Sequence, residues 1–166
     1  NLIAEVERHV NQLSETVKNT MQYDMLQNNR EHISRIINIV GKEECIKNVR
    51  ILNKQGEIIF STDSTQIGQM LNKKAESCYA CHAENEPLQK LAIKERTRIF
   101  RPTPVDSRVL GVINPIYNEK SCWDADCHAH TQDQTVLGVL DITICLREID
   151  AQTEESKMSV ALFAHF

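Results

Sequence analysis

The sequence predicts an α+β fold in which about five mostly antiparallel strands form one sheet, with a long helix before it and another helix after it. Three observations lead to this prediction. Apolar residues recur at helical spacing near both ends of the chain, β-branched runs fill the middle, and the strand-like segments are not separated by long helices. A chain of 166 residues suits one domain with a core of its own.

Helical periodicity marks the first 41 residues. Apolar residues recur every three or four positions from Leu2 onward, and charged residues occupy the other faces. The stripe consists of Val6, Val10, Leu13, Val17 and Met21. A second set, which consists of Ile33, Ile36, Ile37 and Val40, ends at Gly41. Glycine suits the left-handed position after a helix, so we expect a pair of N-terminal helices within residues 1–41.

The period changes in the middle of the chain. VRILNKQGEIIFST (49–62) has β-branched runs on both sides of a loop with Gly56, which is typical of a hairpin. Further strands are predicted in RTRIF (96–100), RVLGVINPIYN (108–118) and TVLGVLDITICL (135–146). Helical spacing returns from about Leu146. The predicted divisions are N-terminal helices (1–41), a core (42–146) and a C-terminal helix (147–166).

The run CYACH (78–82) has the spacing of a covalent haem attachment site. In such a site, Cys78 and Cys81 each form a thioether with the porphyrin, and His82 is the proximal iron ligand. A thioredoxin-like pair, a zinc half-site and a structural disulfide are the alternatives. A redox pair normally belongs to a βαβ unit, which this element order lacks, and zinc needs two further ligands nearby. We therefore expect haem c at this site.

The run SCWDADCHAH (121–130) repeats the pattern with a wider gap. Cys122 and Cys127 enclose four residues, and His128 follows the second thiol directly. This spacing resembles a variant attachment site of multihaem cytochromes, so we expect a second haem c with His128 as its proximal ligand. The main alternative is zinc held by Cys122, Cys127, His128 and His130. Covalent haem also predicts an extracytoplasmic location, and the first motif favours haem at the second.

The remaining cysteines are Cys45, before the first strand, and Cys145, at the end of the last one. A disulfide is geometrically possible if these strands are antiparallel neighbours. Buried free thiols, which pack like small apolar side chains, are the slightly preferred interpretation.

The sixth iron ligands are sought among the other histidines and methionines. A His or Met completes a low-spin iron, whereas an open position admits NO, CO or another small ligand. Met70 lies close in sequence to the first motif, and His32 belongs to the second helix. These two residues and His130, which could serve the other haem, are the distal candidates.

The succession VRILNKQGEIIFST, STQIGQMLNKKAESCYACH, RIFRPTPVDSRVLGVINPIYN and VLGVLDITICL, followed by a helix, resembles a family of sensor domains. These are the extracytoplasmic PAS-like or Cache-type domains of bacterial histidine kinases and chemotaxis-type receptors, in the subset that carries covalent haem. The resemblance implies flanking membrane helices, an inner-membrane protein and a cytoplasmic output module. The second motif departs from the single-haem members.

The chain begins without Met and ends in MSVALFAHF (158–166), which indicates a piece of a longer protein. The apolar end is either the start of a membrane segment or an ordinary amphipathic helix end.

The function implied by the resemblance is detection of redox state or of a small gas ligand at haem iron, without enzymatic activity in the domain itself. A periplasmic dihaem electron carrier is the main alternative, and a haem enzyme is the third. The first helical stripe could form a homodimer or dock on the domain's own sheet. A net charge of −4 without a basic face argues against a nucleic-acid partner.

Overall fold

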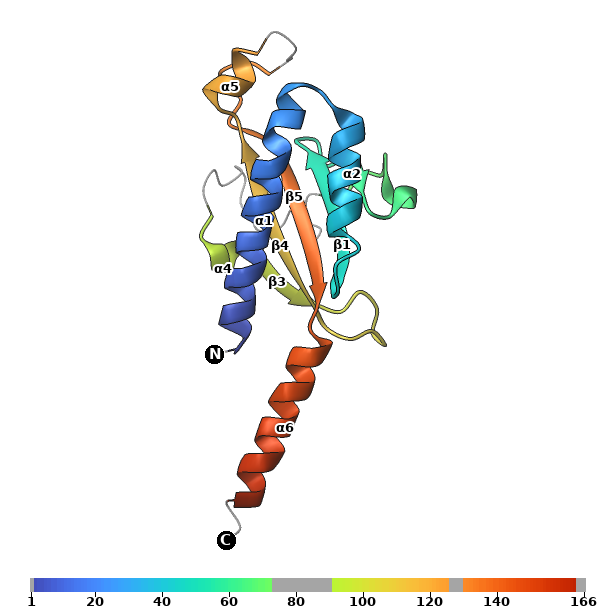
Figure 1. The fold of residues 1–166 in the computed structure, drawn as a ribbon, viewed down its shortest axis with the longest axis vertical. Coiled ribbons are helices and arrows are strands. Elements are labelled where there is room, and N and C mark those ends of the chain that lie inside the picture. The colour runs from blue at the N-terminus through green and yellow to red at the C-terminus, as the bar shows by residue number, and fades with distance from the viewer. Residues whose placement is uncertain (1, 73–90, 126–129, 164–166) are drawn as a thin grey trace.

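The computed structural model describes residues 2–72, 91–125 and 130–163. Its centre is an antiparallel sheet of five strands in the order β2-β1-β5-β4-β3, and two helices cover one face (Figure 1). The helices are α1 (Leu2–Leu26), α2 (Arg30–Val40), α4 (Ile93–Arg96), α5 (Lys120–Trp123) and α6 (Arg147–Phe163), with a 3-10 turn η1 (Ser64–Gln66). The strands are β1 (Ile46–Asn53), β2 (Ile58–Ser61), β3 (Thr97–Phe100), β4 (Val109–Tyr117) and β5 (Val136–Cys145). The predicted α+β fold is confirmed.

The apolar stripe of α1 packs on the domain's own sheet. Val10, Val17 and Met21 are buried, and Val6 and Leu13 pack against the same core. The inward side chains of the central strands meet them, namely Val49, Ile51, Leu110, Val112, Leu140 and Ile142. Burying these side chains is the main stabilising contribution to the fold. The stripe is therefore buried within the chain itself. A homodimer would have to form through other surfaces.

Gly41 corrects one expectation. Its φ is −66°, so the chain does not leave α2 through a left-handed residue. Its N–H donates instead to the carbonyl oxygen of Ile37, as in a continuing helical turn. A Cβ at this position would lie 2.3 Å from Cγ2 of Thr62, just after β2. Glycine is required here because Thr62 lies so close. The described glycines with positive φ are Gly56 (φ +92°), in the predicted hairpin turn, and Gly68 (φ +86°).

A buried ion cluster lies on the sheet face opposite the one that α1 covers. Asp141 of β5 is 1% exposed and accepts hydrogen bonds from Arg50 of β1 at 2.8 Å and from Arg98 of β3 at 2.9 Å. The Arg98 guanidinium reaches Asp141 by crossing Gly111 of β4, where a Cβ would lie 2.6 Å from its Cζ. One carboxylate thus connects three strands through two arginines.

The start of β1 and the end of β5 are joined by a disulfide between Cys45 and Cys145, with their Cα atoms 5.0 Å apart. Their strands are antiparallel neighbours, with Ile46 opposite Ile144. The preference for buried free thiols was therefore wrong, because the antiparallel register brings these two cysteines together at one end of the sheet.

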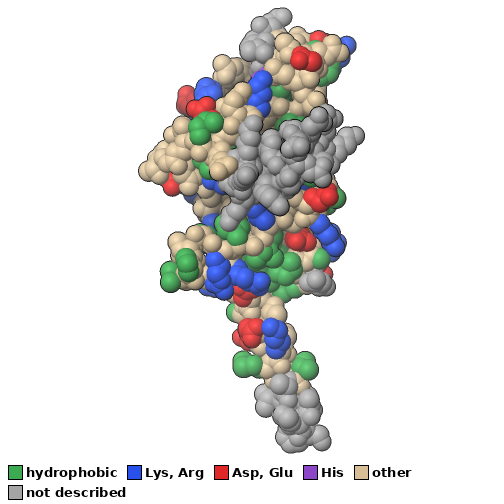
Figure 2. Space-filling view, turned by 180° about the vertical axis from the view of Figure 1, so that it is seen from behind, with side chains coloured by type: hydrophobic (Ala, Val, Ile, Leu, Met, Phe, Trp, Pro, Cys, Tyr) green, Lys and Arg blue, Asp and Glu red, His purple; other side chains and the backbone are tan. Residues whose placement is uncertain are grey.

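The last helix, α6, begins directly after this disulfide and extends away from the body (Figure 1). A cavity of about 310 Å³ lies at the N-terminal end of α6, and its lining includes Lys47, Asp106, Arg108, Cys145 and Arg147. Figure 2 shows Lys and Arg side chains gathered at this end of the body. Residues 151–160 of α6 are all exposed. Within the described ranges, no helix is long and apolar enough to cross a membrane.

An ion pair holds the first turn of α6 to the sheet. Arg108, just before β4, donates hydrogen bonds to both carboxylate oxygens of Asp150, one of them at 3.2 Å. The hydrogen bond from Arg108 lowers the pKa of Asp150 below its ordinary value of 3.8, and the charges of Arg108, Arg101 and Lys157 act in the same direction against the opposing effect of burial.

Replacing Asp150 by asparagine should therefore lower the melting temperature at pH 7. A lowered pKa in the folded state contributes stability above the unfolded value, and this contribution is lost as the pH falls through the folded pKa. The difference between wild type and Asp150→Asn should thus shrink steadily below about pH 3.8. Glu148→Gln, on the same helical turn, is the matched control and should show a smaller difference at pH 7. A difference in melting temperature that stays constant from pH 7 to pH 2 would contradict the stabilising role of the Arg108–Asp150 ion pair.

Candidate functional site

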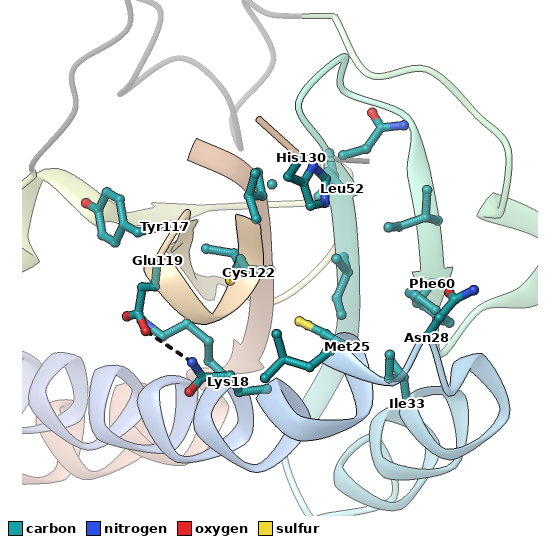
Figure 3. Close-up of a pocket in the computed structure, with 18 of the residues that line it drawn as sticks. Lys18, Met25, Asn28, Ile33, Leu52, Phe60, Tyr117, Glu119, Cys122 and His130 are labelled. Atoms are coloured by element: carbon teal, nitrogen blue, oxygen red, sulfur yellow. Dashed lines mark hydrogen bonds between the residues drawn. The ribbon is translucent and has the colours of Figure 1, made fainter. Parts of the chain in front are cut away.

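A cavity of about 490 Å³ lies between the helices and the end of the sheet near α5 (Figure 3). One wall is formed by α1, the α1–α2 turn and the start of α2, and the floor is formed by β1, β2, β4 and β5. The other wall includes Cys122 of α5 and His130. A volume of several hundred Å³ is typical of small-molecule and cofactor sites.

The strand floor of the cavity is largely apolar, and the helices add apolar side chains to it. The apolar lining consists of Met25, Leu26, Ile33, Ile51, Leu52, Ile59, Phe60, Ile116 and Leu137. Polar side chains lie at two places. Toward α5, Gln22 donates a hydrogen bond to Glu119 at 3.2 Å, and at the α1–α2 turn Asn28 and Arg30 line the cavity (Figure 3). Lys18 and Glu15 also belong to the lining and form an ion pair at 2.9 Å. The cavity therefore offers an apolar interior with charged groups at its edge.

A network behind this edge holds the charged groups in place. Asn114 of β4 is buried, and its side-chain oxygen accepts hydrogen bonds from Lys18 at 3.1 Å and from Arg96 at 3.2 Å. Burial raises the pKa of Glu15, but the hydrogen bond and charge of Lys18, together with Asn114 and Arg96, outweigh it and lower the pKa overall. Glu15 thus stays ionised at neutral pH and keeps the Lys18 ammonium paired.

Cys122 brings the second motif to this cavity. The one-turn helix α5 follows β4 directly, and the N–H of Cys122 donates to the carbonyl oxygen of Glu119 at 2.7 Å. This turn directs the thiol into the cavity (Figure 3). Cys122 is not part of a disulfide. The described residues thus place one unbridged thiol beside this cavity.

His130 enters the cavity from the same side as Cys122 (Figure 3). Its Nδ1 lies 3.2 Å from Oε1 of Gln134. This contact links the imidazole to the loop before β5.

The other predicted residues divide into two groups. Cys78, Cys81, His82, Cys127 and His128 lie outside the described residues, so their roles stay predictions. Within the described part of the chain, no group of three or more His, Cys, Asp or Glu side chains is arranged to hold a metal ion. Two of the four residues of the alternative zinc site, Cys127 and His128, are not in that part.

The distal candidates Met70 and His32 do not line the cavity. Met70 is 62% exposed and pairs through its backbone with Glu57. His32 is on the first turn of α2 with its side chain 49% exposed, and its Nδ1 lies 2.8 Å from a carboxylate oxygen of Asp24. Met25, which the sequence analysis did not select, does line the cavity. In the sequence it follows Met21 by one helical turn, and this spacing alone indicates a core residue.

With the cavity defined, comparisons identify the class of fold. No family model and no curated protein matches the chain. Among solved structures, the chain shares its fold with a bacterial sensor domain. The particular structure that shows this is the DcuS sensor domain of E. coli, at a TM-score of 0.52 and 14% identity over 89% of this chain and 97% of that one. The periplasmic domain of RsbU from Chlamydia trachomatis matches at a TM-score of 0.45 and 12% identity, over 91% of this chain and 56% of that one.

Proposed function

We propose that this chain is the extracytoplasmic sensor domain of a membrane signalling protein and that it carries two covalently bound haems. The observation that carries the proposal is the Cys122 thiol at the wall of a largely apolar cavity of about 490 Å³. The sensor-domain fold supports it. Covalent haem attachment and the disulfide Cys45–Cys145 both suit an oxidising compartment outside the cytoplasm.

In this proposal, thioether bonds from Cys78 and Cys81 hold one haem and those from Cys122 and Cys127 hold the other, with His82 and His128 as proximal ligands. When bound, haem supplies an iron that changes charge on reduction and can take up a small ligand. The apolar side chains of the described cavity would contact the porphyrin, and the Lys18–Glu15 pair supplies charges at its edge. Burial of this kind tunes the reduction potential of the iron.

The fold offers a route from the cavity to the output. Leu137 and Gly138 of β5 line the cavity, and the same strand runs into α6. The inputs in this proposal are redox state or a small gas ligand, and the output is a displacement of α6 toward a cytoplasmic module. A ligand can shift the equilibrium between two positions of α6 only by the difference between its interaction free energies with the two conformations. The exposed residues 151–160 of α6 make it the better candidate for homodimer contacts than the stripe of α1.

Purified, fully matured protein should contain two haems per chain by the pyridine haemochrome assay, because both motifs supply a pair of thiols. Cys122→Ala/Cys127→Ala should halve that number, and so should Cys78→Ala/Cys81→Ala. The matched control is Cys45→Ala/Cys145→Ala, which should leave the haem count unchanged. Colourless protein would overturn the haem assignment. A count of one that is unaffected by the Cys122 variant would remove the second site and favour zinc there.

Absorption spectra of the oxidised and reduced protein, repeated with NO and CO, separate sensing from electron transport. Gas sensing requires at least one iron whose sixth position opens, so the spectrum should shift on gas addition. Two haems that never react with gas would support redox sensing or the alternative function, a periplasmic electron carrier. A redox-dependent change in the protease cleavage of α6 would then support sensing over electron transport.

A further inference from the structure

We propose that the cavity at the N-terminal end of α6 binds a small oxyanion of the phosphate or sulfate type. This cavity has a volume of about 310 Å³ and lies at the opposite end of β1, β4 and β5 from the cavity near α5. The proposal does not depend on haem at either motif, so its success or failure is separate from that of the proposed function.

The charged lining of this cavity is mainly cationic. Lys47 comes from the start of β1, Arg108 from the segment just before β4, and Arg147 is the first residue of α6. Asp106 is the one carboxylate among the described residues of the lining. Three positive side chains and one negative one leave a formal charge of +2, whereas the whole chain has a charge of −4. A concave surface lined mainly by one sign of charge concentrates counter-ions.

Two of the three cations have no partner within the described part of the chain. Arg108 donates hydrogen bonds to both carboxylate oxygens of Asp150, so its charge is already balanced. The side chains of Lys47 and Arg147 are exposed, and neither forms an ion pair or a hydrogen bond with a described residue. An oxyanion in the cavity would balance these two charges.

The start of α6 adds a favourable contribution to the same cavity. N–H groups in the first turn of a helix have no partner within it, and the helix dipole favours a negative charge there. The N–H of Leu146 donates to the carbonyl oxygen of Arg108 at 3.1 Å, which holds this end of α6 at the cavity. The first turn also contains Glu148 and Asp150, but neither carboxylate lines the cavity.

The donors in the lining favour an anion with several oxygens. A guanidinium presents its N–H groups in a planar fork that matches two oxygens of one phosphate or carboxylate group. The ammonium of Lys47 and the hydroxyl of Ser107 add donors from other sides of the cavity. A volume of about 310 Å³ is at the lower end for small-molecule sites, so the ligand is small.

A phosphate group can come from a free anion or from a lipid headgroup, and the position of the cavity favours the free anion. In the proposed function, the membrane follows α6. This helix has 17 residues, which at about 1.5 Å per residue give a length of about 25 Å. It extends away from the body, and the cavity lies at the end where it begins (Figure 1).

Titration calorimetry of the purified protein with sodium phosphate, at constant ionic strength, should show saturable binding of one anion per chain. Lys47→Gln/Arg147→Gln should weaken the affinity at least about tenfold, because it removes both unpaired cations. The matched control is Lys54→Gln/Lys120→Gln, which removes two exposed positive charges at the other end of the sheet and should change the affinity less than about twofold. Asp106→Asn should strengthen binding, since it removes a carboxylate from the lining.

A second measurement needs no variant. Phosphate and sulfate should each raise the melting temperature of the wild type more than chloride does at the same ionic strength, because a ligand of the folded state stabilises it. Equal phosphate affinity in wild type and Lys47→Gln/Arg147→Gln, or no difference between these anions and chloride, would overturn the proposal. Binding to phosphatidylglycerol vesicles without binding of free phosphate would overturn it in favour of a lipid headgroup.

Discussion

Asp141→Asn should lower the free energy of unfolding by about 3 kcal/mol, because it leaves two guanidinium groups on a buried sheet face without their shared carboxylate. Removing one partner of a buried ion pair typically costs about 3–5 kcal/mol. The lower end of that range applies because the side chains of Arg50 and Arg98 are 17% and 15% exposed and can reach some water. Urea denaturation of the variant and wild type measures the difference.

The matched control is Asp124→Asn, which removes an exposed carboxylate 3.9 Å from Lys120. Such exposed pairs contribute less than about 1 kcal/mol. A triple variant, Arg50→Met/Asp141→Leu/Arg98→Met, should recover most of the loss, since apolar side chains of similar size can replace a buried ion cluster. A loss for Asp141→Asn no larger than that of Asp124→Asn would show that the cluster is not a stabilising feature.

The second large effect is expected for the disulfide. Cys45→Ala/Cys145→Ala should destabilise the domain by about 3–5 kcal/mol, because the bridge joins residues 100 positions apart and restricts the unfolded chain. The chain-entropy estimate for a loop of this length is about 4.7 kcal/mol. Unfolding of the wild type with and without a thiol reductant should show a similar difference in the free energy of unfolding.

A backbone control separates the effect of the bridge from that of local strain. Cys45 has φ +68°, a left-handed conformation that favours glycine. Cys45→Gly/Cys145→Ala should therefore be more stable than Cys45→Ala/Cys145→Ala by about 1 kcal/mol. Equal stability of the two variants would show that the left-handed conformation at residue 45 is lost once the bridge is removed.

Most of the fold was predictable because its signals are local. The stripe of α1 and the β-branched runs of β1, β4 and β5 have the spacing of their elements, and each predicted strand is present within a few residues. The one-turn helices α4 and α5 were not predicted, since four residues are too few for a periodic signal. Gly41 was misinterpreted because its reason is the proximity of Thr62, which no local pattern contains.

The candidate site was predictable only in part, for the same reason. Cys122 was found because its motif is contiguous in the sequence. Met25 is 97 positions before Cys122 in the chain, and its membership of the cavity depends on how α1 crosses the sheet. Proximity in sequence selected Met70 instead, and the structure places it on an exposed edge away from the cavity.

The register of β5 with its two neighbours constrains how this strand can move within the sheet. The strand is hydrogen-bonded on both sides, to β1 and to β4. A slip by one residue would exchange Asp141 with its apolar neighbours between the two faces, so sliding of β5 alone is excluded energetically. The register therefore fixes β5 against both of its neighbours. Because only Leu146 separates β5 from α6, the first turn of α6 is held at a fixed place relative to the sheet.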